Sequence, residues 1–294
     1  MSKLEVSILI PTFNCDCSEL VAELSRQAES INGLHYEIIV ADDGSTDRAL
    51  TEQCSKIATL PYTQFIDQGV NIGRAAIRNF LAKKARYQWL IFLDSDMTIP
   101  NGQFLTNYLD SGDEQIVYGG YVVGKGEPSN LRYIYEKKVE PKHRPEERRK
   151  RPFQHFHTSN FLISRNVMLT HPFDERFRNY GYEDVFFGKQ LQRAGYTITH
   201  IDNPAGFYTF ESNASFMDKT EEGMRTLYKF RNDLRGYSVM LTFTGNIHLR
   251  CVRWLIRLWH KLFGGLERLW LCSSHPNLKI FEIYKLGYFL SIKN

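Results

Sequence analysis

The stretch YEIIVADDGS at residues 36–45 is an apolar run that ends abruptly in two acids, a glycine and a serine. An apolar run closed by turn residues is typical of a buried strand followed by a loop. Similar runs at 6–10, 62–67 and 88–93 predict three more buried strands, with helical spacing between them at 18–30, 46–57 and 74–85. Strands that alternate with helices form right-handed βαβ units. We therefore expect an α/β fold with a mainly parallel central sheet flanked by helices.

This alternation stops after Pro100. Strand patterns at 116–123, 155–163 and 196–201 and a helix at 183–194, ended by Gly195, are more widely spaced. From about residue 213 the chain has a helical pattern. We expect an α/β domain over 1–215 and a helical C-terminal extension over 216–294.

The composition excludes several classes of protein. Of 294 residues, 43% are hydrophobic and 24% charged, which excludes a disordered chain or a collagen-like fibre. Five cysteines, an odd number, exclude a disulfide scaffold and indicate free thiols in a reducing compartment. We find neither a signal peptide nor an apolar run of the roughly 18–20 residues that span a bilayer. The expected location is the cytoplasm, with peripheral attachment to the cytoplasmic face of a membrane as the alternative.

The net charge of +4 is unevenly distributed. Residues 137–151 carry a net +5 and residues 250–268 a net +4, so the remainder is acidic. Such segments favour contact with something anionic. We expect 137–151 to be a long solvated loop, or alternatively a segment that closes over the phosphates of a donor or of a lipid-linked acceptor.

Residues 249–270 have apolar side chains at helical spacing and basic side chains opposite them. One interpretation is a helix whose apolar face packs on the core while its basic face is solvated. The other, which the tryptophans and the cationic excess favour, is a helix lying in the plane of an anionic membrane. In that case the lipid phosphates would meet Arg250, Arg253, Arg257 and Lys261. Gly264-Gly265 predicts a kink or a split in this helix.

Polar clusters follow three of the predicted strands: Pro11-Thr12-Phe13-Asn14, Asp42-Asp43-Gly44-Ser45 and Asp94-Ser95-Asp96. In a parallel sheet these carboxyl ends converge on one edge, where open α/β sheets bind ligands. Taken singly, each cluster has a simpler explanation. Asp43 or Ser45 could cap the next helix, and Asp94 or Asp96 could serve a turn.

Taken together, carboxylates at one edge repel one another, by about 3 kcal/mol for a pair ~6 Å apart. Their hard oxygen ligands suit Mg²⁺ or Mn²⁺, which often shares its shell with ligand phosphates. A nucleotide diphosphate that bridges the metal would satisfy such a site. Asp43 could also accept the ring N–H of uracil. In Asn71-Ile72-Gly73-Arg74 the glycine allows close backbone approach, and the arginine can pair with phosphate.

Gly181-Tyr182-Glu183-Asp184 places two acids at the start of a helix. Their negative charges could simply interact favourably with the helix macrodipole, or one of the two could act as a general base. Residues 157–160 are polar strand residues, which alone are a weak signal.

Six motifs taken in order resemble the family 2 inverting glycosyltransferases of the GT-A fold, over about residues 4–215. They are Pro11-Thr12-Phe13-Asn14, Asp42-Asp43-Gly44-Ser45, Asn71-Ile72-Gly73, Asp94-Ser95-Asp96, Ser159-Asn160-Phe161 and Gly181-Tyr182-Glu183-Asp184. The resemblance implies a nucleotide-sugar donor, usually UDP-linked, and a divalent metal, Mn²⁺ or Mg²⁺. It implies a glycan or lipid-linked acceptor, no nucleic acid, and a role in polysaccharide biosynthesis as a hexosyl- or N-acetylhexosaminyl-transferase.

The resemblance also implies roles for single residues. Thr12 and Asp43 would line the base pocket, Gly73 the nucleoside, Asp94 the ribose and metal, Asp96 the metal, and Asp184 would be the base. The other candidate binding residues are Pro11, Asn14, Asp42, Asn71, Arg74, Ser95, Asn160 and Glu183. The chain departs from many relatives at Phe207, where a histidine metal ligand is expected. His200 lies nearby and could be misaligned with that role.

The expected mechanism is a single displacement with inversion at the anomeric carbon. Two alternatives stay open. One is a non-catalytic protein that binds a nucleotide or glycan. The other is a phosphatase that uses the Asp-x-Asp-x-Thr pattern at 94–98, although that motif normally opens its domain and here follows three strand–helix units.

Overall fold

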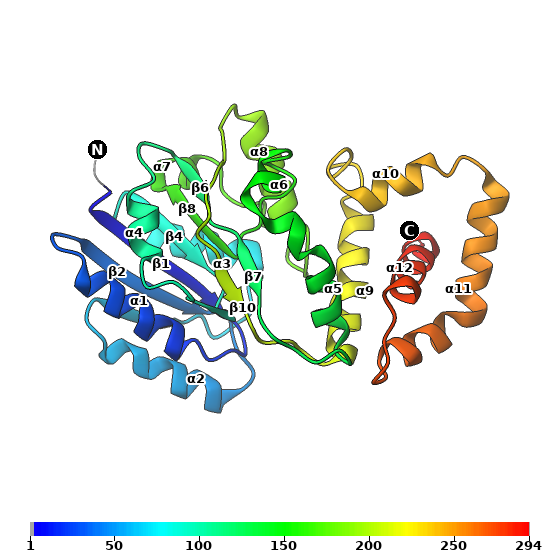
Figure 1. Cartoon of the computed structure of the whole chain (residues 1–294), viewed down its shortest axis with the longest axis horizontal. Coiled ribbons are helices and arrows are strands. Elements are labelled where there is room, and N and C mark those ends of the chain that lie inside the picture. Colours follow the sequence, from blue (N-terminus) through cyan, green and yellow to red (C-terminus); the bar gives the residue numbers. More distant parts are fainter. Residues whose placement is uncertain (1–2, 294) are drawn as a thin grey trace.

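The computed structural model describes residues 3–293. Its centre is a seven-stranded sheet of order β3-β2-β1-β4-β8-β6-β9 (Figure 1). The first four strands in the chain are parallel, β8 runs antiparallel between β4 and β6, and β9 is parallel to β6. The bounds are β1 Glu5–Thr12, β2 His35–Asp42, β3 Thr63–Asp67, β4 Trp89–Leu93, β6 Ile116–Tyr118, β8 Asn160–Ser164 and β9 Thr199–His200. The predicted α/β class and mainly parallel sheet are confirmed.

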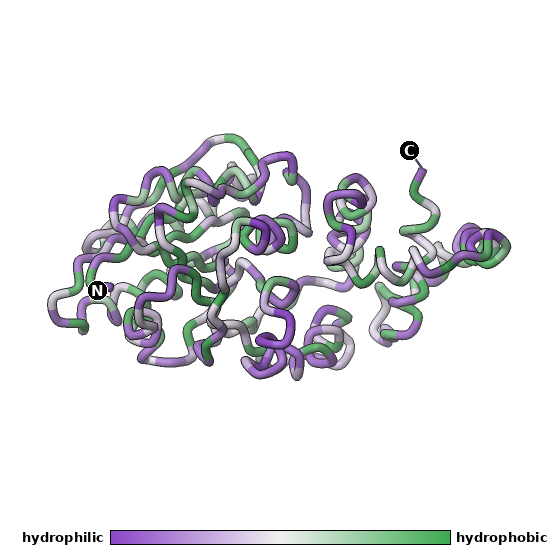
Figure 2. Tube along the Cα trace, turned by 90° about the horizontal axis from the view of Figure 1, so that it is seen from above, coloured by the Kyte–Doolittle hydropathy of each residue, from purple (hydrophilic) through white to green (hydrophobic). Residues whose placement is uncertain are grey.

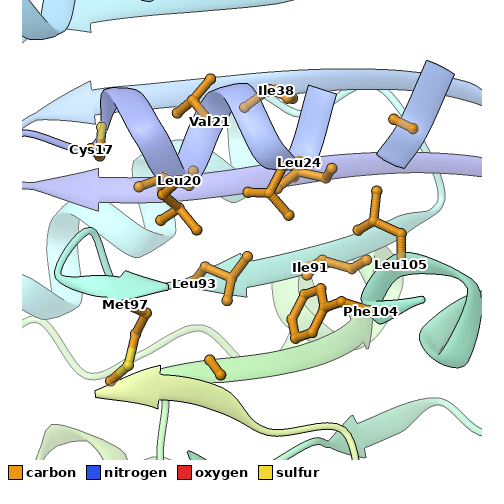
Figure 3. Packing of buried hydrophobic residues seen from close by; sticks show 14 of the residues in the cluster. Cys17, Leu20, Val21, Leu24, Ile38, Ile91, Leu93, Met97, Phe104 and Leu105 are labelled. Carbon is orange, nitrogen blue, oxygen red and sulfur yellow. The ribbon is translucent and has the colours of Figure 1, made fainter. Parts of the chain in front are cut away.

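Helices cover both faces of this sheet because alternate strand residues point to opposite sides. On one face Val6, Ile8 and Ile10 pack against α1 and α4; Figure 3 shows part of this cluster, including Leu20 and Leu24. On the other face lie α3, α7 and α8. The bounds are α1 Ser18–Ser30, α2 Arg48–Ser55, α3 Arg74–Lys84, α4 Phe104–Leu109, α7 Arg165–Thr170 and α8 Glu183–Arg193.

The strand predicted at 116–123 is wrong as one strand, because it divides into β6 and β7 (Tyr121–Val123). β7 joins a separate small sheet of order β5-β10-β7, with β5 Met97–Thr98 and β10 Ala205–Phe207. The break falls at Gly119-Gly120. Gly120 has φ +85°, and a Cβ there would lie 2.8 Å from the Arg148 guanidinium. The split therefore makes room for a buried arginine.

The prediction of a solvated loop at 137–151 is also wrong. This basic segment forms the end of α5 (Leu131–Val139), a 3₁₀ turn η2 (Glu140–His143) and α6 (Pro145–Arg149). Arg148 is fully buried and donates to the carbonyls of Tyr118 at 3.1 Å, Gly119 at 3.1 Å and Ile201 at 2.8 Å. Part of the positive charge thus anchors the segment to the sheet.

The C-terminal part is helical, as predicted, with α9 Asn213–Lys229, α10 Val239–Asn246, α11 Arg250–Leu271 and α12 Leu278–Ser291. It extends away from the sheet, at the end of the molecule opposite the N-terminus (Figure 2). The domain boundary predicted at 215/216 falls within α9, and Leu131 of α5 packs into one cluster with Phe216 and Phe281. None of the helices in the described part of the chain combines the length and the hydropathy of a membrane span.

The sequence predicts a kink or a split at Gly264-Gly265. Helix α11 is continuous there, so it is not split, and Figure 1 shows its axis changing direction. Of the two interpretations of this helix, the one in which its apolar face packs on the core is wrong. That face is exposed. On the other side, Arg253 is half-buried and donates to the carbonyls of Ile247 and Thr244, both at 2.8 Å. Arg257 donates from Nε to the carbonyl of Leu290 at 2.6 Å but stays exposed. Arg253 is therefore withdrawn from the expected contact with lipid phosphates, whereas Arg257 is not.

Candidate active site

The carboxyl ends of β1, β2 and β4 lie side by side at one edge of the sheet, as the sequence predicts. At the end of β2, Asp43 is buried and its carboxylate accepts the backbone N–H groups of Ile72 at 2.7 Å and Gly73 at 3.1 Å. These bonds attach the loop that precedes α3 to the end of β2. Gly73 has φ +95°, and a Cβ there would lie 2.9 Å from the carbonyl oxygen of Arg178, so only glycine fits without strain.

The other polar residues at this edge hold its loops together. The Thr12 hydroxyl donates to the Cys15 carbonyl at 3.0 Å, and Asp42 accepts the Ser45 N–H at 2.9 Å. Asn14 accepts the Thr46 N–H at 2.8 Å, which joins the loops after β1 and β2. Pro11 is the second-last residue of β1, Ser95 is half-buried after β4, and Asn71 is exposed before α3. The N-cap of α2 is Asp47, so the alternative of a cap at Asp43 or Ser45 is wrong.

Two arginines of α3 compensate the acids at the end of β4 and the start of α8. Arg78 is buried and contacts Asp94 at 2.5 Å. Arg74 contacts Asp94 at 3.6 Å and donates from Nε to Glu183 at 2.9 Å. Much of the repulsion expected at this edge is therefore offset by guanidinium groups.

A cavity of about 610 Å³ lies beside this cluster. Asp94 and Asp96 reach it from the end of β4, Glu183 and Asp184 from the start of α8, and Arg74 from α3. Its other walls come from α5, α9 and α12, so the helical part of the chain helps to enclose it. Asp96 and Asp184, far apart in the sequence, share this cavity. Thr12, Asp43 and Gly73 lie outside it and are connected to it through Arg74.

Asp184 is hydrogen-bonded to a histidine that the sequence singled out only weakly. His157 Nδ1 lies 3.1 Å from Asp184 Oδ2, and the Val185 N–H donates to Oδ1 at 2.7 Å. Burial alone would raise the pKa of Asp184, but the hydrogen bond and charge of His157, the Val185 N–H and the charge of Arg74 outweigh it and lower that pKa. The carboxylate is thus held in its basic form by its surroundings.

Asp96 is the acid of this group that forms no salt bridge within residues 3–293. Loss of solvent around the carboxylate and the neighbouring Asp94 raise the pKa of Asp96, so its charged form is destabilised, and a bound cation would stabilise it. Mg²⁺ and Mn²⁺ are held through one or two carboxylates together with ligand phosphates, and Asp96 fits that need. Asp94, predicted as a second ligand, is already paired with arginine.

No third protein ligand joins Asp96. Phe207 lines the cavity and lies opposite Met97 in the register of the small sheet, so an aromatic ring stands where a histidine ligand is expected. His200 does not replace it, because its Nδ1 contacts Arg148 and its Nε2 the Pro152 carbonyl. Within residues 3–293 no group of three or more His, Cys, Asp or Glu side chains could hold a metal ion.

Asn160 does not line the cavity and is fully buried. Its amide nitrogen donates to the carbonyls of Gly120 at 2.8 Å and Asn203 at 2.9 Å, and its oxygen accepts the Tyr108 hydroxyl at 2.6 Å. With both ends of the amide engaged, Asn160 positions strands, and we remove it from the candidate binding residues.

The sequence missed Arg78, which pairs with Asp94 outside the cavity, and several residues of the cavity wall. Arg78 lies one helical turn after Arg74, and that i, i+4 spacing after Gly73 could have indicated it. Tyr121 and Glu136 share a hydrogen bond of 2.9 Å, and the Tyr121 hydroxyl lies 2.8 Å from His143. Nothing in the local sequence pairs residues that come from β7, α5 and η2.

Comparison with known proteins gives a family and a fold. The profile of the family described as "Glycosyl transferase family 2" matches residues 7–170, more than half of the chain. A chondroitin synthase of Pasteurella multocida (strain Pm70) is 26% identical over 242 residues, which cover 69% of this chain and 24% of that protein. A chondroitin synthase of Escherichia coli is 23% identical over 239 residues, which cover 69% of this chain and 34% of that protein. The matched region thus spans about a quarter to a third of these relatives.

Two solved structures resemble nearly the whole chain. S. aureus TarS 1–349 in complex with UDP has a TM-score of 0.53 at 18% identity, covering 97% of this chain and 89% of that one. The mannosyltransferase PcManGT from Pyrobaculum calidifontis, in complex with GDP-Man and Mn²⁺, has a TM-score of 0.56 at 14% identity, covering 97% and 84%. The predicted fold, a GT-A-like α/β domain with C-terminal helices, is confirmed.

Proposed function

Because the chain belongs to glycosyl transferase family 2, we propose that it transfers a sugar from a UDP-linked donor to a hydroxyl group of a glycan or lipid-linked acceptor. The observation that carries this proposal is the shared cavity of Asp96 and Asp184. Asp96 forms no salt bridge within residues 3–293 and is suited to a cation, whereas Asp184 is kept ionised by its surroundings and so is free to accept a proton. A donor diphosphate and an acceptor hydroxyl need such a pair side by side.

Asp184 is the proposed general base. Its carboxylate accepts the proton of the acceptor hydroxyl as that oxygen attacks the anomeric carbon, and the bond to the diphosphate breaks on the opposite side, which inverts the configuration. His157 is a positioning residue, since its bond to Oδ2 leaves the remaining lone pairs of the carboxylate for the acceptor.

Positive side chains on the cavity wall, Arg74 and Lys219, would hold the diphosphate. Asp96 would hold Mn²⁺ or Mg²⁺ together with the diphosphate, and a bound ion would neutralise charge on the leaving group. The complex of PcManGT with GDP-Man and Mn²⁺ supports such an ion.

The nucleoside would lie at the sheet edge next to this cavity. Asp43, Thr12 and Gly73 are the proposed contacts of the uracil and ribose, while Asn14 and Asp42 keep the loops in shape. The complexes of TarS with UDP and with UDP-GlcNAc support UDP as the nucleotide.

A non-catalytic binding protein is the second candidate. The bond between Asp184 and His157 counts against it, because a binding site gains nothing from a basic carboxylate beside the acceptor position. The phosphatase alternative would need Asp94 as a free nucleophile, whereas Arg78 and Arg74 hold that carboxylate.

A panel of sugar nucleotides tests the proposal through release of the nucleoside diphosphate, with Mn²⁺ and with a chelator. We expect slow, Mn²⁺-dependent hydrolysis of one UDP-sugar, hexosyl or N-acetylhexosaminyl, in the absence of acceptor. Tight binding of a UDP-sugar without any release would favour the binding protein. Release from a GDP-sugar alone would contradict the choice of UDP.

A further inference from the structure

The outer face of α11 is an exposed apolar surface. Its residues recur at three- and four-residue spacing and point away from the rest of the chain. Leu255, Leu262, Leu266 and Leu269 are 56–69% exposed. The whole surface, called the α11 face below, consists of Leu249, Leu255, Trp259, Leu262, Phe263, Leu266, Leu269 and Trp270.

The inner contacts of α11 fix this orientation. Arg268 donates from Nε to Glu221 of α9 at 2.9 Å. The ring of His260 packs against Tyr284 and Tyr288 of α12, at 5.2 and 5.9 Å between centroids. Turning the apolar side chains inward would break these contacts together with the arginine bonds to backbone carbonyls. The exposed face is therefore built into the fold, and a monomeric soluble protein rarely exposes so large an apolar surface without a partner.

We propose that the α11 face inserts into the interfacial layer of an anionic lipid bilayer, with the helix lying in the membrane plane. The inference deepens the proposed function by giving the source of a lipid-linked acceptor, and it rests on that function only in this respect. In Figures 1 and 2, α11 forms the outermost edge of the molecule, so no described segment covers it.

The composition of the face favours lipid as its occupant. Two of the four tryptophans of the chain, Trp259 and Trp270, lie on it, and tryptophan prefers the boundary between headgroups and acyl chains. The one acid of the helix, Glu267, accepts the indole N–H of Trp259 at 2.7 Å. The face thus offers lipid no unpaired carboxylate.

The opposite side of α11 carries basic charge. Arg250, Arg257 and Lys261 are exposed, and no salt bridge within residues 3–293 involves any of them. They are the three of the four predicted lipid contacts that remain exposed. Anionic headgroups would attract these cations, which a second copy of the apolar face would not do.

Tryptophan fluorescence tests the proposal directly, because three of the four indoles report on α11. The full chain is titrated with phosphatidylcholine vesicles with and without phosphatidylglycerol, and then with vesicles of brominated acyl chains. We expect a blue shift and quenching by the brominated lipid, stronger with phosphatidylglycerol and only partly reversed by high salt. Absence of quenching at low salt would overturn the proposal, and so would complete reversal by salt.

A matched pair of variants separates insertion of the α11 face from non-specific binding of the protein to vesicles. Leu262→Glu with Leu266→Glu should lower the vesicle partition coefficient by at least about tenfold. Leu4→Glu with Leu169→Glu, an equal change at two exposed leucines outside α11, should leave it unchanged. Equal effects of both variants would overturn the assignment to α11. The proposal would also be overturned if the wild-type chain did not bind vesicles but sedimented as a dimer, and the Leu262/Leu266 variant sedimented as a monomer.

Donor hydrolysis in detergent-free buffer keeps this proposal distinct from the catalytic one. The Leu262/Leu266 variant should release UDP at the wild-type rate. If vesicle binding fails while hydrolysis persists, only the membrane surface is wrong. If hydrolysis fails while vesicles bind, only the catalytic proposal is wrong.

Discussion

The α/β domain and the C-terminal helices place charge and apolar surface in opposite ways. In the domain, large apolar side chains are buried around the sheet, and charged groups gather at the edge where β1, β2 and β4 end. In α11, Arg253, Arg257 and Arg268 bind groups of the protein itself and the apolar side chains face outward. The two regions therefore suit different partners: the cavity of the α/β domain suits a charged ligand, and the outer face of α11 suits an apolar layer.

Two leucines test this contrast with the same substitution. Leu162 of β8 is fully buried and Leu262 of α11 is 62% exposed. Leu162→Glu should lower the free energy of unfolding by about 4 kcal/mol or more, because it places an unpaired carboxylate in the core. Leu262→Glu should change it by less than about 0.5 kcal/mol. Urea denaturation measures both, and similar losses would break the comparison.

Within the cavity, Asp184→Asn should have the largest effect on catalysis. We expect turnover to fall by about 10²- to 10⁴-fold, since the amide cannot accept the acceptor proton. Donor affinity, measured by calorimetry with Mn²⁺, should stay within about twofold. Asp110→Asn, at an exposed acid that follows α4, is the control. Normal turnover in the Asp184 variant would disprove its role as the base.

Asp96→Ala should act on donor binding instead. We expect the gain in donor affinity that Mn²⁺ provides to fall by about tenfold or more, while the affinity measured with chelator stays near the wild-type value. Titrations of a UDP-sugar with and without Mn²⁺ measure this gain. An undiminished response to Mn²⁺ would remove Asp96 from the metal site.

The smallest expected effect is a shift in pH dependence. Asp184 works as a carboxylate, and its lowered pKa keeps it ionised as the pH falls. His157→Ala removes the main influences that lower this pKa, so burial should raise it and the acid limb of the kcat profile should move to higher pH. His157→Gln, which keeps a hydrogen-bond donor, should move the limb less. An unmoved limb in both variants would leave His157 with only a packing role.

Much of the sheet edge could be predicted from the sequence, because strand–helix alternation and the rule for carboxyl ends depend on local pattern alone. The division of the predicted strand at Gly119-Gly120 could not be predicted, because it makes room for Arg148, a residue 28 positions later than Gly120. The same arginine explains why the basic segment is helical rather than solvated. The distribution of charge along the chain does not show which basic side chains will donate hydrogen bonds to buried backbone carbonyls.

The acids that line the cavity could be predicted from the sequence motifs, but the residues that pair with those acids could not. The motifs locate Asp94, Asp96 and Asp184, but the pairing of Asp94 with Arg78 and of Asp184 with His157 depends on tertiary contacts. Asn160 was predicted as a binding residue because a motif does not show which side of a strand faces the cavity. In α11 the periodicity identified two faces correctly, yet periodicity cannot say which face meets the protein.

A crystal structure of the protein with UDP and Mn²⁺ tests the central claim most directly. We expect the uracil beside Asp43 and Gly73, the diphosphate beside Arg74, and the ion on Asp96 with the Asp184 carboxylate facing the same space. A nucleotide bound at any other surface, or a diphosphate separated from both Asp96 and Asp184, would contradict it.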